Sequence, residues 1–443
     1  MMPMPIMMLL LASHHWCSTA VLAPATNSVA PPASTVSVTP GTINRIDESF
    51  HCWTVEPSPR SGFDQRNLSH AALSGNKLYY TARLSLPGHI RFGGANGLRY
   101  FNCSDRKSLR GLQGPSPRNA LGTPVPPLGR QRCLNESWAD NMLSLANHSC
   151  MRGNGQFPCL VVSLNRQART ADGRWDPMDA RALIRRGVAH FPVDLRSFLP
   201  TFLPVNPTQP FFGFDFAPSS EDQDLGDPAG VAADYAALHA LVSELFAGAD
   251  PTRLPAYSGQ PELLSPTIAV SERDAASGAK AGHFLETFAM ECHSLGVPMF
   301  ALSYGQTVEA EAGRTRATMP TGRELNASMD VARKMHDTLG ATGLALWASN
   351  AADSDHIQPG EQAQPAEEAG SFAEIFWTLD GMGSSAQLGH SVWCRAPFLV
   401  AAGIIDERNY DPHPIFWGGY AWSQLMGTGV LQVRVSLLLV TRS

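Results

Sequence analysis

Apolar and polar residues follow two alternating rhythms along the centre of the chain. Short runs that are apolar throughout predict buried strands at 157–164, 211–216, 297–302, 343–347 and 391–394. Between them, stretches with one apolar face predict helices at 138–146, 179–188, 284–295, 327–339 and 372–388. Strands that lack a polar face and alternate with amphipathic helices are typical of a parallel sheet covered on both sides.

About eight such strand–helix units predict an α/β fold of the (β/α)8 TIM-barrel type, although the pattern alone also allows a doubly wound sheet. One helix has a clear start, because Asp227 is a suitable N-cap and Pro228 suits the first turn. Its apolar residues share one face of the helix: Val231, Tyr235, Leu238, Leu241, Val242 and Leu245.

The two ends of the chain differ from its centre. Residues 1–25 resemble a signal peptide with an apolar run too short to cross a membrane, and residues 26–40 predict a linker. We expect strands of a small β side domain at 41–86, the barrel at 87–415, and the start of a C-terminal β side domain at 416–443. This last segment is short for a β-sandwich, so a truncated side domain is expected.

The charge balance narrows the possible partners. A formal net charge of −6 and a pI near 6.2 argue against a nucleic-acid partner, which requires a basic surplus or stripe. The densest basic spots are 130–132 and the group Arg181, Arg185 and Arg186. We interpret the second group as a solvated helix face, because both spots are small for a surface that grips a polyanion.

Sequence features of the secretory pathway accompany the leader-like start. Five Asn-x-Ser sequons favour passage through that pathway. We therefore expect a secreted or extracellular glycoprotein without a transmembrane span, with a lysosomal, vacuolar or membrane-associated location as alternatives. The sequons lie at Asn67, Asn102, Asn135, Asn147 and Asn326.

The chain has eight cysteines, none of them in a Cys-x-x-Cys pair, so a structural zinc site is not expected. Cys103 with Cys133, and Cys150 with Cys159, are possible disulfides in an oxidising compartment. Spacing alone leaves the pairing open.

No cofactor or catalytic metal is expected. His51, His89 and His356 have no ligand spacing. The glycine-rich stretch 93–97 lacks the Lys-Ser/Thr of a phosphate-binding loop and predicts a turn instead.

Several motifs follow one another in a characteristic order. The most distinctive are Arg-Phe-Gly-Gly at 91–94 and Trp-Asp-Pro, followed by Ala-Arg-Ala-Leu-Ile, at 175–184. Further blocks lie at 133–138, 160–165, 372–380 and 406–414. Together they resemble the heparanase-type endo-β-glucuronidases, a barrel family of retaining glycoside hydrolases, over roughly residues 40–435.

The resemblance implies cleavage of β-glucuronides by two glutamates, an acid and a nucleophile, at the ends of two different strands. It places the acid after the strand at 211–216, where this chain has Ala217 or Ser219. It places the nucleophile after Trp347, where this chain has Ser349. A serine without a positioned base cannot replace a carboxylate in this chemistry, so hydrolytic competence is doubtful.

Two carboxylates lie just beyond these positions, Glu221 and Asp353, and could act as displaced catalytic residues. The simpler interpretation is that both belong to solvated loops. Three hypotheses therefore stay open: a heparanase-like protein that acts on or recognises glucuronic-acid-containing glycans, a non-catalytic glycan- or partner-binding protein, and an active β-glucuronidase-type glycosidase with displaced carboxylates.

The expected ligands are the glycan chains of polysaccharides or proteoglycans. Asp215 is predicted to face the barrel interior as a buried acid, and Trp347 to be either a sugar platform or part of the core. The full predicted substrate-binding set is Arg91, Asn165, Asp215, Tyr304, Trp347 and Arg395.

Overall fold

The computed structural model describes eighteen segments of the chain, which are 34–46, 49–55, 88–93, 100–101, 133–134, 136–149, 151–152, 155–156, 159–166, 168–190, 211–216, 227–247, 260–271, 275–308, 322–353, 372–395, 404–406 and 410–437. The chain divides into two compact units, one formed by Thr42–Leu431 and the other by Met1–Gly41 with Gln432–Ser443. The predicted leader lies outside the described residues.

The larger unit is a closed barrel of parallel strands. Nine strands pair in the order β10-β9-β8-β3-β2-β14-β13-β12-β11. Leu264, just after β10, pairs in parallel with Ala301 at the start of β12, so β10 and β11 share one position between β9 and β12. Nine strands at eight positions therefore close the ring, which confirms the predicted barrel. The strands are β2 (His51–Val55), β3 (His89–Phe92), β8 (Leu160–Leu164), β9 (Phe211–Phe216), β10 (Glu262–Leu263), β11 (Ile268–Ser271), β12 (Ala301–Val308), β13 (Ala345–Asp353) and β14 (Val392–Arg395).

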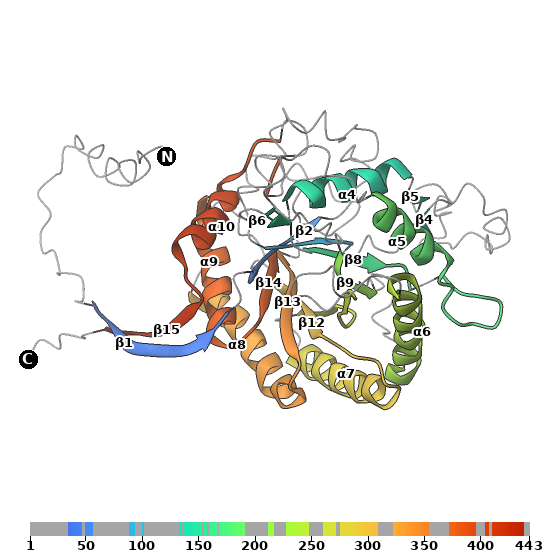
Figure 1. Cartoon of the computed structure of the whole chain (residues 1–443). Helices are drawn as coiled ribbons and strands as arrows, with labels where there is room; N and C mark the ends of the chain where they lie inside the picture. The colour runs from blue at the N-terminus through green and yellow to red at the C-terminus, as the bar shows by residue number, and fades with distance from the viewer. Residues whose placement is uncertain are drawn as a thin grey trace, which may run out of the picture. The chain divides into compact units, whose positions relative to one another are not determined.

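Helices surround this ring, as Figure 1 shows. From β3 onward, each barrel position is followed by one helix along the chain. No helix among the described residues is long and apolar enough to span a membrane. The helices are α4 (Glu136–Ser149), α5 (Met178–His190), α6 (Pro228–Phe246), α7 (Ala275–Ser294), α8 (Gly322–Leu339), α9 (Phe372–Gln387) and α10 (Pro414–Leu425), with a short 3-10 helix η7 (Gly340–Thr342) before β13.

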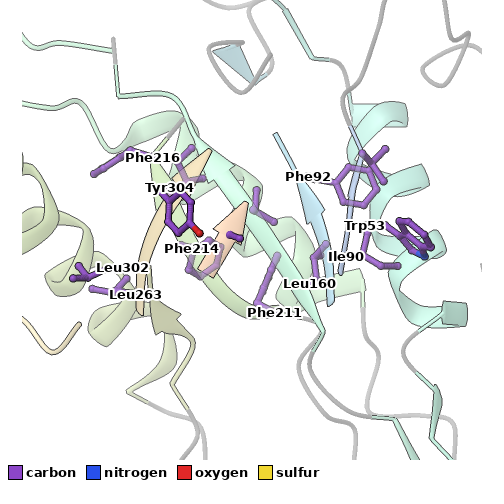
Figure 2. Packing of buried hydrophobic residues seen from close by; sticks show 14 of the residues in the cluster. Trp53, Ile90, Phe92, Leu160, Phe211, Phe214, Phe216, Leu263, Leu302 and Tyr304 are labelled. Carbon is purple, nitrogen blue, oxygen red and sulfur yellow. The ribbon is translucent and has the colours of Figure 1, made fainter. Parts of the chain in front are cut away.

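A continuous apolar layer fills the space between strands and helices. Alternate residues of each strand point outward into it, because successive side chains of a strand face opposite sides. Phe92 of β3 meets Trp138 of α4 with ring centroids 5.8 Å apart, and Phe216 of β9 meets Tyr235 of α6 at 4.9 Å. Figure 2 shows part of this layer, from Trp53 and Phe92 to Phe216 and Tyr304.

Helix α6 starts as predicted but without the expected cap bond. Asp227 occupies the N-cap position and Pro228 follows it, yet the Asp227 side chain makes no capping hydrogen bond. The predicted apolar face is buried except for the half-buried Leu245, and the helix also carries the buried Asp234. Arg166 and Arg169 both donate to this carboxylate, at 2.8 and 2.7 Å, so the loop after β8 is tied to α6.

The structure differs from the predicted arrangement at both ends of the barrel. The range 41–86 was assigned to a side domain, but β2 pairs with β3 and β14 and is the first barrel strand. The predicted side-domain range 416–443 holds most of α10, which packs on α9. Outside the barrel, β1 (Ser34–Arg45) and β15 (Gly429–Leu437) form a two-stranded sheet, and β4 (Tyr100–Phe101) with β5 (Cys133–Leu134), and β6 (Met151–Arg152) with β7 (Gly155–Gln156), form two short ones.

A disulfide that the spacing did not suggest joins the first and last barrel strands. Cys52 of β2 and Cys394 of β14 are direct partners in register and are bonded to each other. Cys159 is also disulfide-bonded, whereas Cys150, its predicted partner, lies outside the described residues. Cys292 is a buried free thiol. The disulfide therefore covalently links the first and last barrel strands, which are neighbours in the closed ring.

Candidate functional site

The interior of the barrel has two layers of different chemistry. The lower layer, in the amino-terminal half of the strands, is a buried apolar cluster of Cys52, Val161, Leu264, Ala301, Trp347, Val392 and Cys394. The upper layer lies about two residues further along each strand and is polar. Its members are Thr54, Arg91, Ser163, Asp215, Thr267, Ser303 and Ser349. The upper layer is at the carboxyl ends of the strands, the end at which barrel enzymes bind their ligands.

An ion pair is the centre of the upper layer. Arg91 Nη2 and Nε donate to Asp215 Oδ2 at 2.5 and 3.1 Å, and both side chains are 1% exposed. Arg91 Nη2 also donates to Thr267 Oγ1 at 2.7 Å. A buried charge without its partner destabilises the folded protein. Removal of either Arg91 or Asp215 should therefore lower the free energy of unfolding.

A chain of hydroxyl groups continues from the ion pair across the barrel. Thr267 Oγ1 lies 2.8 Å from Ser303 Oγ, which donates to Ser349 Oγ at 2.7 Å. The backbone N–H of Ser303 donates to Ser265 Oγ at 2.7 Å. The hydrogen bonds thus connect Arg91 of β3 to Ser349 of β13. They pass through Thr267, which lies between β10 and β11, and through Ser303 of β12. Sequence reasoning missed this chain, because isolated serines and threonines in strands carry no distinctive signal.

Three polar atoms of the upper layer have no hydrogen-bond partner among the described residues. They are Asp215 Oδ1, Ser163 Oγ and Thr54 Oγ1. Their residues are 1%, 7% and 0% exposed. Ser163 and Asp215 are direct partners in register between β8 and β9. Acceptors and hydroxyls for a polar ligand are therefore present on neighbouring strands.

Ser349 occupies the position that the resemblance assigns to the nucleophile. It lies in the middle of β13, is fully buried, and accepts a hydrogen bond from Ser303 in the upper layer. No base contacts its hydroxyl among the described residues. The residue can therefore take part in hydrogen bonding, but the arrangement does not activate it for attack.

Asn165, immediately after β8, is held at the end of the barrel. Trp175 Nε1 donates to the Asn165 carbonyl oxygen at 3.0 Å, and the Trp175 ring meets Phe216 at 4.9 Å. Arg169 and Trp175 form an antiparallel bridge that folds the loop back on itself. The Trp-Asp-Pro motif thus supports the position of Asn165 and the end of β9.

Trp347, Arg395 and Tyr304 of the predicted binding set lie away from the upper layer. Trp347 is fully buried in the lower layer, 5.8 Å from Phe212 and 5.0 Å from His89 between ring centroids. Arg395 is on the outer side of β14, with its guanidinium 4.6 Å from the centre of the Trp377 ring on α9. Both arrangements are those of packed core side chains.

Tyr304 also faces outward, into the layer between strands and helices. Its hydroxyl lies 2.9 Å from His390 Nε2, and His390 Nδ1 lies 3.2 Å from the carbonyl oxygen of Ser385 on α9. Burial lowers the pKa of His390 to about 4 and raises the pKa of Tyr304. The imidazole is therefore neutral at physiological pH, and the pair joins β12 to the start of β14.

Of the two predicted replacement carboxylates, the structure describes the backbone of Asp353 and no part of Glu221. Asp353 is the last residue of β13 and is in register with Val308 of β12, and its side chain lies outside the described residues. Ala217, Ser219 and Glu221 lie outside them altogether. Within the described part of the chain, no group of three or more His, Cys, Asp or Glu side chains could hold a metal ion.

The predicted basic helix face is engaged in ion pairs between neighbouring helices. Arg181 of α5 pairs with Glu244 of α6, and Arg186 pairs with Asp140 and Glu136 of α4. The Glu244 bond raises the pKa of Arg181 and lowers that of the carboxyl group. These two arginines therefore do not form a free cationic surface for a sulfated glycan.

Comparison with known proteins finds local sequence relatives and more distant structural ones. No family model matches the chain. "Heparanase-like protein 1" of Arabidopsis thaliana is 34% identical over 64 residues, which are 14% of this chain and 12% of the relative. "Heparanase-like protein 2" of the same plant is 30% identical over 66 residues, 15% of this chain and 12% of the relative. Over these short stretches, the chain is similar to heparanase-like proteins.

Solved structures share the fold of this chain. An alpha-L-arabinofuranosidase from Thermotoga maritima covers 91% of this chain and 76% of its own, with a TM-score of 0.53 and 11% identity. The GH51 arabinofuranosidase from Xanthomonas axonopodis pv. citri covers 93% and 80%, with a TM-score of 0.52 and 10% identity. At such identities the likeness establishes the barrel fold alone, and the plant relatives are matched over only 12% of their length.

Proposed function

We propose that this heparanase-like protein recognises glucuronic-acid-containing glycans at the carboxyl ends of the barrel strands and does not hydrolyse them. The observation that carries the proposal is Ser349. At the position that the resemblance assigns to the nucleophile, the chain has a buried hydroxyl bonded to Ser303 in place of a carboxylate. Retaining hydrolysis requires two carboxyl groups about 5–5.5 Å apart.

The upper layer also supports binding without turnover. Its one carboxylate among the described residues, Asp215, is bonded to Arg91, so its charge is already compensated. A nucleophile must be free to form a bond with the anomeric carbon. Asp215 instead provides a fixed acceptor beside a row of hydroxyl groups, which suits recognition of a polyhydroxylated ligand.

Binding and turnover can be separated with one series of ligands. We expect the purified protein to bind oligosaccharides that contain glucuronic acid, measured by calorimetry, and to release no nitrophenol from 4-nitrophenyl β-glucuronide. Asn165→Ala should weaken binding about tenfold, because it removes the side-chain amide of the residue that directly follows β8, at the carboxyl ends of the strands. Glu244→Gln on the outer surface of α6 is the matched control and should bind like the wild type.

The competing hypothesis is hydrolysis by displaced carboxylates. It requires nitrophenol release that is lost in Glu221→Gln or Asp353→Asn and kept in Glu244→Gln. Such a result would overturn the non-catalytic part of the proposal. Absence of binding to every glucuronic-acid-containing oligosaccharide would overturn the proposal as a whole.

A further inference from the structure

Two unpartnered polar atoms lie on neighbouring positions of the upper layer. Ser163 Oγ and Asp215 Oδ1 have no hydrogen-bond partner among the described residues, and their residues are directly paired between β8 and β9. Leaving a buried donor or acceptor unsatisfied costs about 1–3 kcal/mol, so folded proteins rarely keep two such atoms together without a ligand or ordered water.

The surroundings hold both atoms in place. Asp215 is fixed through its other oxygen, Oδ2, by two bonds from Arg91. Gly93 has a φ of 148°, and a Cβ built on it would overlap Cβ and Oγ of Ser163. Only glycine at position 93 therefore leaves the Ser163 hydroxyl where it is. The Arg-Phe-Gly-Gly motif thus supplies the residue that orients Asp215 and the residue that makes room for Ser163.

We infer that Ser163 Oγ and Asp215 Oδ1 form a subsite for a ring hydroxyl of a bound sugar, an inference that rests on the proposed glycan recognition. A carboxylate in an ion pair only accepts hydrogen bonds, whereas a serine hydroxyl both donates and accepts. The ligand atom must therefore be a donor. A sugar hydroxyl satisfies both protein atoms, and the carboxylate of a uronic acid, which offers only acceptors, does not.

Only one part of a glucuronide fits this subsite. A ring hydroxyl lies against Asp215, and the uronate carboxylate points away from it. Neutral pyranosides that carry the same hydroxyl therefore share this contact with glucuronides. Discrimination between neutral and acidic sugars must come from other residues.

A thermodynamic cycle between protein and ligand tests the contact. The ligands are 4-nitrophenyl β-glucuronide, the matching β-glucoside, and analogues of the glucuronide that each lack one ring hydroxyl. We expect Ser163→Ala to weaken binding of the glucuronide about fivefold, the size of one neutral hydrogen bond. For the one analogue that lacks the contacting hydroxyl, the same substitution should change the affinity less than twofold, because the interaction is already absent.

The matched control is Thr378→Val. Thr378 of α9 is also fully buried, and its Oγ1 is also without a partner, but it lies outside the barrel interior. It should leave all affinities unchanged. Both variants should unfold at the same or a slightly higher denaturant concentration than the wild type, because each removes an unsatisfied hydroxyl.

The outcomes separate the two proposals. If the wild type binds the glucuronide and Ser163→Ala binds it equally well, the two atoms hold only water and the inference is overturned while the proposed function stands. If only the β-glucoside binds and its binding depends on Ser163, the proposed function is overturned and the inference stands. If neither ligand binds, both are overturned.

Discussion

The lower and upper layers of the barrel interior come from the same strands, about two residues apart, and have opposite chemistry. In the lower layer, Trp347 stacks near Phe212, and the Cys52–Cys394 disulfide links β2 to β14. Above, Arg91 and Asp215 form a buried ion pair. Interior positions of one strand repeat every second residue, so two steps along the chain change the role of the barrel from packing to polar contact.

The largest effect is expected in the upper layer, from loss of the arginine. Arg91→Met should destabilise the protein by about 3–5 kcal/mol, because Asp215 would be left buried without its partner. Urea unfolding midpoints measure the change. Arg181→Met, which breaks an exposed pair with Glu244, should leave the urea midpoint nearly unchanged. Equal losses in the two variants would show that the upper layer is solvated.

The second-largest loss of stability is expected when the disulfide of the lower layer is removed. Replacing Cys52 and Cys394 together by alanine should cost about 2–4 kcal/mol, because the bond joins residues 342 positions apart and restricts the unfolded chain. Adding a reducing agent to the wild type should lower the stability at least as much, because it also breaks the disulfide of Cys159. Cys292→Ala removes a thiol that is already free. It should therefore leave the sensitivity to reducing agent intact, and a variant insensitive to the agent would contradict the assignment.

A smaller effect is expected on the outer side of the barrel wall, at His390. Its pKa in the folded protein is about 4, below the ordinary value of 6.5, so the unfolded chain binds more protons between these values. The free energy of unfolding should fall on the order of 1–2 kcal/mol between pH 7 and pH 5 and be independent of this group above pH 7. His390→Gln should flatten that part of the profile, and His336→Gln should not.

The smallest effect is expected for Ser349, at the end of the hydroxyl chain. Ser349→Ala removes one hydrogen bond to Ser303 and should cost about 1 kcal/mol or less in unfolding experiments. Ser303→Ala interrupts the middle of the chain and should cost more. A loss of several kcal/mol for Ser349→Ala would mean that the hydroxyl chain, and not only the Arg91–Asp215 pair, stabilises the upper layer.

Local pattern predicted much of the fold, and its failures have identifiable causes. The predicted strand at 211–216 is β9, and the helix predicted to start after Asp227 is α6. The fifth barrel position was missed because Pro266 separates the short strands β10 and β11, and proline interrupts a ladder.

Helix α10 was missed for a different reason. Gly418 and Gly419 weaken the helical signal, yet both are needed where the helix packs closely. A Cβ on Gly419 would lie within 2.9 Å of ring atoms of His51 and Trp53, and one on Gly418 would lie 2.8 Å from Ile375.

The predicted binding set was divided by the fold. Arg91 and Asp215 are brought together, and Asn165 lies at the end of β8. Trp347 and Arg395 are of residue types that often bind sugars. Their positions in the strands, however, direct both side chains into the packed core. No local signal separates an inward residue from an outward one in a strand that is buried on both faces.

By itself the sequence determined the strand–helix alternation, the order of the motifs that resemble the heparanase family, and the serine at the position that this resemblance assigns to the nucleophile. These are properties of short stretches, and local periodicity and residue identity express them directly. Only the tertiary structure decided which distant residues meet: Cys52 with Cys394, Arg91 with Asp215, and Ser303 with Ser349. Those pairs depend on the closure and register of the ring, in which a shift of one residue would turn each side chain to the opposite face.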